Sequence, residues 1–289
     1  MNIPPGFHVE FRESIGDGSI SDGKVEQLVS KINESALRFT TELRVIGNRG
    51  KIVLGDKITS LKWVMEPERG WPPKMETSAS CLLNLFLENS IRNLPAPDIH
   101  QNFGTFKLKT LELDNYTINA DFSAGKPLHL EKLEFRNCDA NMCPTSDRTP
   151  CTAREVIVYM SDCQVLYPFD FTDVTRLVLH TMAVRDEPHM LTHFAQHAAK
   201  ILLRLTTLKT LDISGVLFIK DDILEVIKQL QILESIHVRI TCLDFLIHHL
   251  CLEHATDLTQ ACPNIKQISC DDLPRLEIDS DSSIDDPYW

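Results

Sequence analysis

A nine-residue frame with apolar side chains at its first, fourth and sixth positions recurs along this chain. Its best example is Leu130-Glu-Lys-Leu133-Glu-Phe135-Arg-Asn-Cys138. The matches start at Ile58, Leu82, Leu108, Leu130, Ala153, Val174, Leu208, Leu233 and Ile265, and most of the intervals are between 21 and 26 residues. A repeat of this period predicts that one supersecondary unit is stacked many times.

The frame has the periodicity of a short strand, in which successive side chains point to opposite faces. The fourth and sixth positions then point into a core, and the third, fifth and seventh point outward. An Asn or Cys at the ninth position would fill the bend after the strand; Cys138 fits, and Ser161 and Thr241 are partial substitutes. The period is that of a leucine-rich repeat. We therefore expect an α/β fold, a leucine-rich-repeat-like solenoid with parallel strands on the concave side and helices or irregular crossovers outside. A non-repeat α/β fold is the alternative.

Three zones follow from the pattern. Residues 1–57 predict a loose arm, a helix over 21–39 and a hairpin made of 42–46 and 51–54, which together would cap the stack. Residues 58–275 hold the degenerate repeats. Residues 276–289 form an acidic segment with few apolar side chains, which predicts a disordered tail.

Late crossovers show helical periodicity, whereas the earlier ones are rich in Pro, Gly and Asn. After Pro188, apolar residues on one helical face are Leu191, Phe194, Ala198, Ile201 and Leu205, and after Asp222 they are Ile223, Val226, Ile227 and Leu230. Helices are thus expected outside the last strands.

The net charge of −12 and the absence of any run of basic residues disfavour nucleic acid and anionic membrane as partners. No run of eighteen apolar residues and no basic-then-apolar leader stand in the sequence, so neither a membrane span nor a signal peptide is expected. Nine scattered cysteines then predict free thiols in a reducing compartment, the cytoplasm or the nucleus. The expected partner is a protein or a peptide.

The outward positions of the central strands supply the candidate binding residues. Two adjacent frames place apolar Ile157, Tyr159 and Val178 where other frames place polar groups, which is typical of a binding hot spot. The alternative is that this region is buried core. The full set of candidates is Glu112, Glu134, Arg136, Ile157, Tyr159, Val178, His180, Asp212, His237 and Arg239.

No motif for catalysis, cofactor or metal binding is complete, so we expect a non-enzymatic protein with no cofactor and no metal. The segment His248-His-Leu-Cys251-Leu-Glu-His254 supports the alternative, a metal-dependent or thiol enzyme. His193 and His197 are spaced as in a metalloprotease helix, but Phe194 stands where the general base belongs. Cys138, Cys143, Cys151 and Cys163 lack the tight spacing of a zinc knuckle.

The frames and the segment Cys262-Pro-Asn-Ile265-Lys-Gln-Ile268 resemble the repeats of F-box/leucine-rich-repeat proteins and the repeat-like regions of nematode F-box proteins. The resemblance covers residues 58–275. It implies recruitment of a substrate to a ubiquitin ligase, with a ligase component as a second partner. The first 60 residues have no Leu-Pro followed by the helices of an F-box. Only the recruiting role is therefore carried over.

Overall fold

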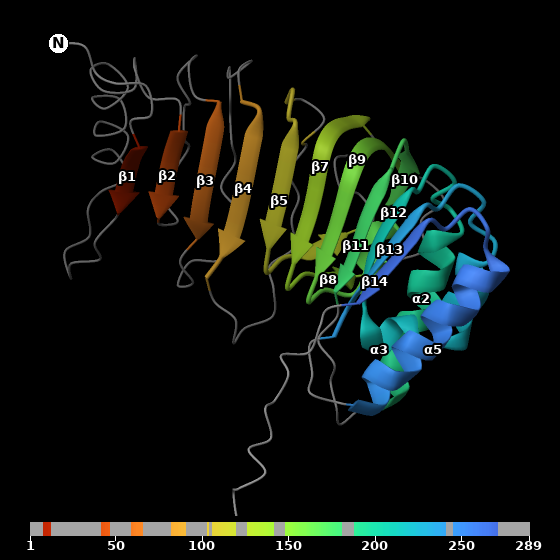
Figure 1. Ribbon diagram of the computed structural model, residues 1–289. Helices are drawn as coiled ribbons and strands as arrows, with labels where there is room; N and C mark the ends of the chain where they lie inside the picture. The colour runs from red at the N-terminus through yellow and green to blue at the C-terminus, as the bar shows by residue number, and fades with distance from the viewer. Residues whose placement is uncertain are drawn as a thin grey trace, which may run out of the picture.

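The computed structural model describes residues 8–12, 42–46, 59–65, 82–90, 103, 106–119, 126–141, 148–180, 188–240 and 245–270. Its main feature is one 12-stranded sheet in an α/β fold, in which every described strand pair is parallel (Figure 1). In spatial order its strands are β1 (His8–Arg12), β2 (Glu42–Ile46), β3 (Ser60–Met65), β4 (Asn84–Asn89), β5 (Thr110–Asp114), β7 (Leu128–Arg136), β9 (Thr149–Tyr159), β11 (Arg176–His180), β12 (Thr210–Ser214), β13 (Ser235–Arg239) and β14 (Gln267–Cys270). This confirms the α/β class and the parallel strands.

Three short strands complete the pairing. β10 (Phe169–Thr172) pairs with the first half of β9, while β11 pairs with its second half. β6 (Thr117–Asn119) and β8 (Asp139–Asn141) form a separate two-stranded parallel sheet. β6 follows the bend at the end of β5, and β8 follows the bend at the end of β7.

The nine predicted frames lie in register across the sheet. Each third-position residue pairs with the third-position residue of the next frame, in the order Ser60, Asn84, Thr110, Lys132, Glu155, Arg176, Thr210, Ser235 and Gln267. A backbone feature repeats with them: the carbonyl of Lys209, at the second position, accepts N–H bonds from both Glu234 and Ser235. Thr59, Leu83, Lys109, Thr175 and Glu234 accept two such bonds in the same way. The frame therefore determines the register between neighbouring strands as well as the position of each strand in the sequence.

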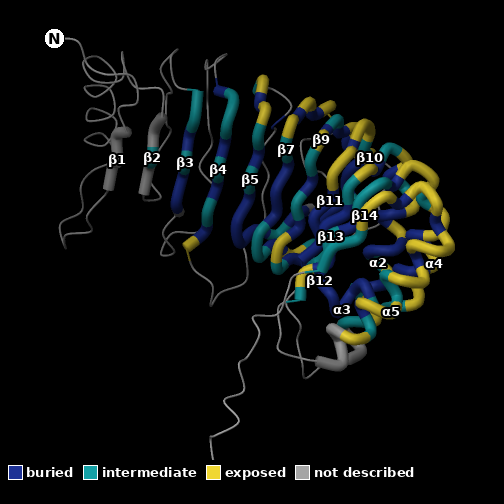
Figure 2. Tube along the Cα trace, in the orientation of Figure 1, coloured by how far each residue is buried: buried dark blue, intermediate teal, exposed yellow. Residues whose placement is uncertain are grey.

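The core lies on the side of the fourth and sixth positions. Pairs such as Leu111 and Leu113, or Leu133 and Phe135, are fully buried in one continuous apolar cluster. Buried residues run along the strands and along the inner sides of the helices, and exposed residues lie on the outer turns (Figure 2). Burying each such side chain contributes about 2 kcal/mol.

The bend after each central strand is made at the eighth position. Asn115, Asn137 and Met160 have φ values of 64°, 48° and 51° there. Asparagine tolerates this left-handed conformation better than most residues, and the Asn137 side chain also donates a 2.8 Å bond to Asp114. At the ninth position, the N–H of buried Cys138 donates a 2.9 Å bond to Ser161 Oγ. The recurrent Asn thus stands one place before the position expected from the sequence.

Helices follow β9 and the later strands. They are the 3₁₀ helix η4 (Cys163–Leu166) and the α-helices α2 (Pro188–Leu202), α3 (Gly215–Phe218), α4 (Asp221–Ile227) and α5 (Phe245–Ala261). Ala198 and Ile201 of α2 and Ile223 of α4 are buried in the apolar cluster, which confirms the two predicted helical crossovers. The sheet curves strongly from β7 to β14, where α2, α3 and α5 lie along one side of it (Figure 1). Among the described residues, no helix has the length and apolar character needed to cross a membrane.

The N-terminal strands differ from the expected hairpin. β2 pairs in parallel with β1 and with β3, so it extends the same sheet. The hairpin partner 51–54, the helix 21–39 and the tail 276–289 lie outside the described residues. The hairpin prediction for 42–46 is wrong, because this strand bonds to neighbouring frames on both sides.

Candidate partner-binding face

The third, fifth and seventh frame positions share the face of the sheet opposite the apolar cluster. We call it the helix-free face, because the described helices pack on the other side. All ten predicted binding residues lie on it in two rows. The fifth-position row is Glu112, Glu134, Ile157, Val178, Asp212 and His237, and the seventh-position row includes Arg136, Tyr159, His180 and Arg239.

Glu134 is the centre of a first ion-pair cluster on this face. Its side chain is only 3% exposed and lies 2.6 Å from Lys132 Nζ, which also bonds Glu112 at 3.0 Å. Arg136 contacts the other carboxylate oxygen. Burial alone would raise the pKa of Glu134, but the hydrogen bonds from Arg136 and Lys132 outweigh it and hold the pKa below its usual range. A charged Glu134 thereby fixes the two cations above it.

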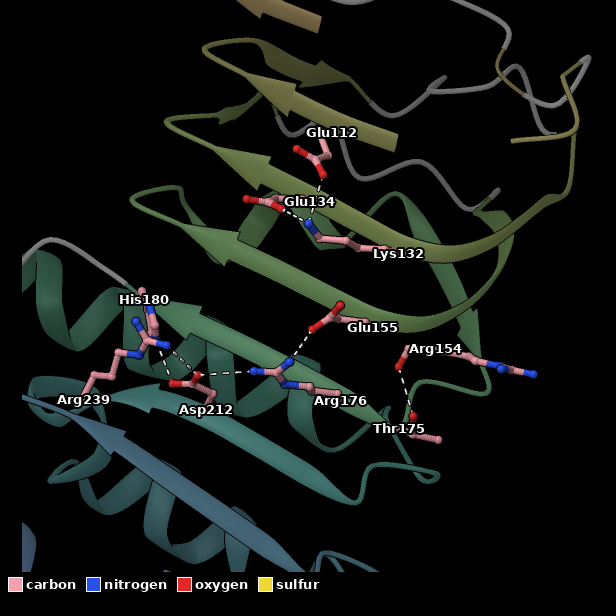
Figure 3. A network of polar contacts seen from close by, with 10 residues as sticks. All are labelled: Glu112, Lys132, Glu134, Arg154, Glu155, Thr175, Arg176, His180, Asp212 and Arg239. Atoms are coloured by element: carbon pink, nitrogen blue, oxygen red, sulfur yellow. Dashed lines mark hydrogen bonds and ion pairs between the residues drawn. The ribbon is translucent and has the colours of Figure 1, made fainter. Parts of the chain in front are cut away.

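Asp212 is the centre of a second cluster (Figure 3). Its carboxylate accepts a 2.7 Å bond from buried His180 and lies 3.3 Å from Arg239 and 3.8 Å from Arg176. Arg176 also bonds Glu155 at 2.7 Å. Burial alone would raise the pKa of Asp212, but the bond from His180 and the charges of His180 and Arg239 lower it below the usual value. Glu134 and Asp212, the centres of the two clusters, lie on either side of β9.

The three apolar residues predicted as a hot spot, Ile157, Tyr159 and Val178, lie between the centres of these clusters and differ in how far they are exposed. Val178 is buried, Ile157 is half-buried, and Tyr159 is 41% exposed. The Tyr159 ring stands edge-on to His180, with centroids 5.9 Å apart. The two interpretations of this region therefore apply to different residues: Val178 is buried on this face although it is not part of the apolar cluster, and Tyr159 is accessible to a partner.

Three arginines with exposed side chains lie on the same face as this tyrosine, and Arg136 pairs with it in register on the neighbouring strand. The side chains of Arg136, Arg176 and Arg239 are 43%, 49% and 44% exposed, whereas the carboxylates beneath them are nearly inaccessible. Arg176 is absent from the predicted site because the choice of site residues favoured the fifth and seventh positions. Arg176 could have been found from the sequence, because it stands at the third frame position, which also points outward.

A groove crosses the helix-free face over β3, β4 and β5. It has a volume of about 410 Å³. Short side chains at the third positions, Ser60, Asn84 and Thr110, leave this space open, and Lys62, Phe86, Glu112 and Arg136 border it. Lys62 Nζ lies 4.1 Å from the centre of the Phe86 ring. The sequence-based candidates included only Glu112 and Arg136 from this region, because the frames starting at Ile58 and Leu82 are weak matches.

The residues of the enzyme alternative point in different directions. Cys251 of α5 is fully buried and its thiol lies 3.8 Å from the Gly215 carbonyl, whereas His249 is exposed and His254 is half-buried. Burial raises the pKa of the Cys138, Cys151 and Cys163 thiols to about 12. Within the described ranges, no three His, Cys, Asp or Glu side chains are grouped to hold a metal ion. No family model, no curated protein and no solved structure matches this chain.

Proposed function

We propose that this protein is a non-enzymatic interaction scaffold of the leucine-rich-repeat type, whose helix-free face binds a protein or a peptide. The observation that carries the proposal is the exposed Tyr159 on an in-register face that also presents three exposed arginine side chains. Tyrosine and arginine are the residue types most enriched among binding hot spots. Buried Glu134 and Asp212 hold these guanidinium groups in place, which lowers the conformational entropy that binding would cost.

The solenoid interpretation is supported by the order of pairing and by the widths of the elements. Each frame's strand lies beside the strand of the next frame. A helix is about 10 Å wide and strands are about 4.8 Å apart, so helices placed outside successive strands bend the sheet away from themselves. The helix-free face is then the concave face, a common binding surface of repeat proteins.

The charges of the face favour a protein partner over a nucleic acid. The Lys and Arg side chains of the two clusters are paired with Glu or Asp, so the described residues of these clusters offer no continuous basic surface for phosphates. The proposed location is the cytoplasm or the nucleus, where free thiols stay reduced. The resemblance to F-box/leucine-rich-repeat proteins suggests that the captured protein is a substrate for ubiquitination.

The test is quantitative affinity purification with mass spectrometry of the wild type, Tyr159→Ala and Tyr159→Ala/Arg176→Ala. Leu252→Ala is the matched control, because Leu252 is 48% exposed on α5, away from the helix-free face. Val178 is unsuitable, since a change at this buried residue would perturb the packing of its neighbours on the face. We expect specific partners to be lost from both Tyr159 variants and retained by the control.

Two outcomes would contradict the proposal. One is a set of partners that Tyr159→Ala leaves unchanged, and the other is an equal loss with Leu252→Ala. Recovery of a cullin and its adaptor with the wild type would support the ubiquitin-ligase role in particular. Their absence would leave an adaptor without that role.

A further inference from the structure

Two imidazole groups converge on the surface of α2, apart from the helix-free face. His193 and His197 are four residues apart and so lie on one side of the helix. Their Nε2 atoms are 3.0 Å apart and their ring centroids 4.2 Å apart. His193 is exposed and His197 is partly exposed. The two Nε2 atoms therefore face each other within hydrogen-bond distance, at a surface that solvent ions can reach.

Tyr167 fixes the second of these rings from a different element. Its hydroxyl bonds His197 Nδ1, and its ring packs against the imidazole with centroids 5.2 Å apart. Tyr167 follows η4 directly, so the bond links η4 to α2. A partner on Nδ1 is what orients a metal-binding histidine, because it holds the ring and leaves Nε2 for the metal.

The spacing of the two nitrogens selects among metal geometries. With metal–nitrogen bonds of about 2.05 Å, two ligands at a right angle have nitrogens roughly 2.9 Å apart, and two ligands at a tetrahedral angle roughly 3.3 Å apart. The observed 3.0 Å fits the right angle. Right-angled N and O sites suit Cu²⁺ and Ni²⁺, and Cu²⁺ and Ni²⁺ also rank high in the general affinity order of divalent metals.

We propose that His193 and His197 form a two-imidazole site for a divalent transition metal ion, with Ni²⁺ and Cu²⁺ preferred over Zn²⁺ and water filling the remaining positions. The proposal is independent of partner binding on the helix-free face. Both rings bind as neutral imidazoles through Nε2. The proton that now lies between the two Nε2 atoms moves to Nδ1 of the ring that carries it. This Nδ1–H then donates a hydrogen bond to the Tyr167 hydroxyl from His197, or to solvent from His193, so the net charge of the pair is unchanged.

The test is isothermal titration calorimetry of the full chain with NiCl₂, then ZnCl₂, in a phosphine reductant that keeps the thiols reduced. The variants are His193→Ala, His197→Gln and Tyr167→Phe. His249→Ala is the matched control, since His249 is an exposed histidine on α5. The double variant His193→Ala/His197→Gln supplies the baseline for any other sites in the chain.

We expect one Ni²⁺ site above this baseline. Either histidine change should remove it, Tyr167→Phe should weaken it by about tenfold, and His249→Ala should leave it unchanged. Ni²⁺ should bind more tightly than Zn²⁺. The proposal is overturned if the wild type equals the double variant, or if His249→Ala removes the site and His193→Ala does not. Tighter binding of Zn²⁺ than of Ni²⁺ would refute the predicted geometry.

Discussion

Met160 is the one residue of the three consecutive bends that is neither Asn nor Gly. Its φ of 51° matches those of Asn115 and Asn137 at the same frame position. The left-handed conformation costs an ordinary residue about 1 to 2 kcal/mol, and asparagine less. We therefore expect Met160→Asn to raise the free energy of unfolding by about 1 kcal/mol. Urea denaturation followed by circular dichroism measures the change.

Met160→Ala is the control for this prediction, because alanine keeps the Cβ that makes the conformation costly. It should give no gain in stability. An equal gain from Ala and Asn would show that the methionine side chain, and not the backbone conformation, is the source of the cost.

Asp212 makes the stability of the protein dependent on acid pH. Its pKa is lowered in the folded state, because the bond and charge of His180 and the charge of Arg239 outweigh burial. Its contribution is therefore complete above the unfolded pKa of about 3.9 and is lost as the pH falls through the lower folded value. We expect Asp212→Ala to cost about 2 kcal/mol at pH 7, because it removes the acceptor of the buried His180 N–H and the counter-charge of two half-exposed arginines.

The measurement for Asp212 is urea denaturation of wild type and variant at pH 7 and at pH 3. The difference between the two proteins should shrink on acidification. Asp170→Asn is the control, since Asp170 is exposed on β10, and it should change stability little at either pH. A difference that stays constant from pH 7 to pH 3 would contradict the role given to the Asp212 charge.

At the scale of elements, the sequence places a strand in the repeat sheet where all three apolar positions of the frame are present, and not where the first apolar residue is lacking. β2 carries Leu43 and Val45 at the fourth and sixth positions, but Thr40 stands at the first. β1 has Val9 and Phe11 in the same places, and Gly6 at the first. Hydrogen bonding to β3 in register is what makes β2 a strand of this sheet, and no local pattern encodes it.

The second frame position offers a test of the strand pairing. The side chain of Lys209 is exposed, yet its N–H donates a 2.9 Å bond to the Thr175 carbonyl. Lys209→Pro removes this donor, and the Thr175 carbonyl keeps only its bond from the Thr210 N–H, which should cost about 1 kcal/mol. Lys209→Ala keeps the donor and should be nearly neutral. Thermal unfolding of both variants gives the comparison, and equal melting temperatures would show that the N–H has no structural role.

At the scale of the whole molecule, the rows of the helix-free face followed from the frame alone, because side chains alternate along every strand. The accessibility of those rows did not. Asp212 is buried because Arg176 reaches over it from β11 and Arg239 from β13. Burial of a side chain on this face therefore depends on the long side chains of neighbouring frames. The sequence therefore identified the candidate face but not which residues of it a partner can touch.

Stacking of frames also determines the order in which the protein should lose its structure. Among the described strands, β14 pairs with β13 alone, whereas β7 and β9 are paired on both sides. An end frame is held by one interface and an inner frame by two, so the end frame opens at lower cost. We expect thiol labelling in rising urea to modify Cys262 and Cys270, beside and in β14, before Cys138 and Cys151 of the central frames.

Mass spectrometry of labelled peptides measures this order, and labelling in full denaturant is the control that sets each thiol's intrinsic rate. In the folded protein Cys138 and Cys151 should react slowly, since burial raises their pKa to about 12 and the thiolate is the reactive form. Labelling of all four thiols at one urea concentration would show a single cooperative unit, because then no frame opens without the others. A stepwise order from Cys270 toward Cys138 would instead match frames that are held mainly by their nearest neighbours.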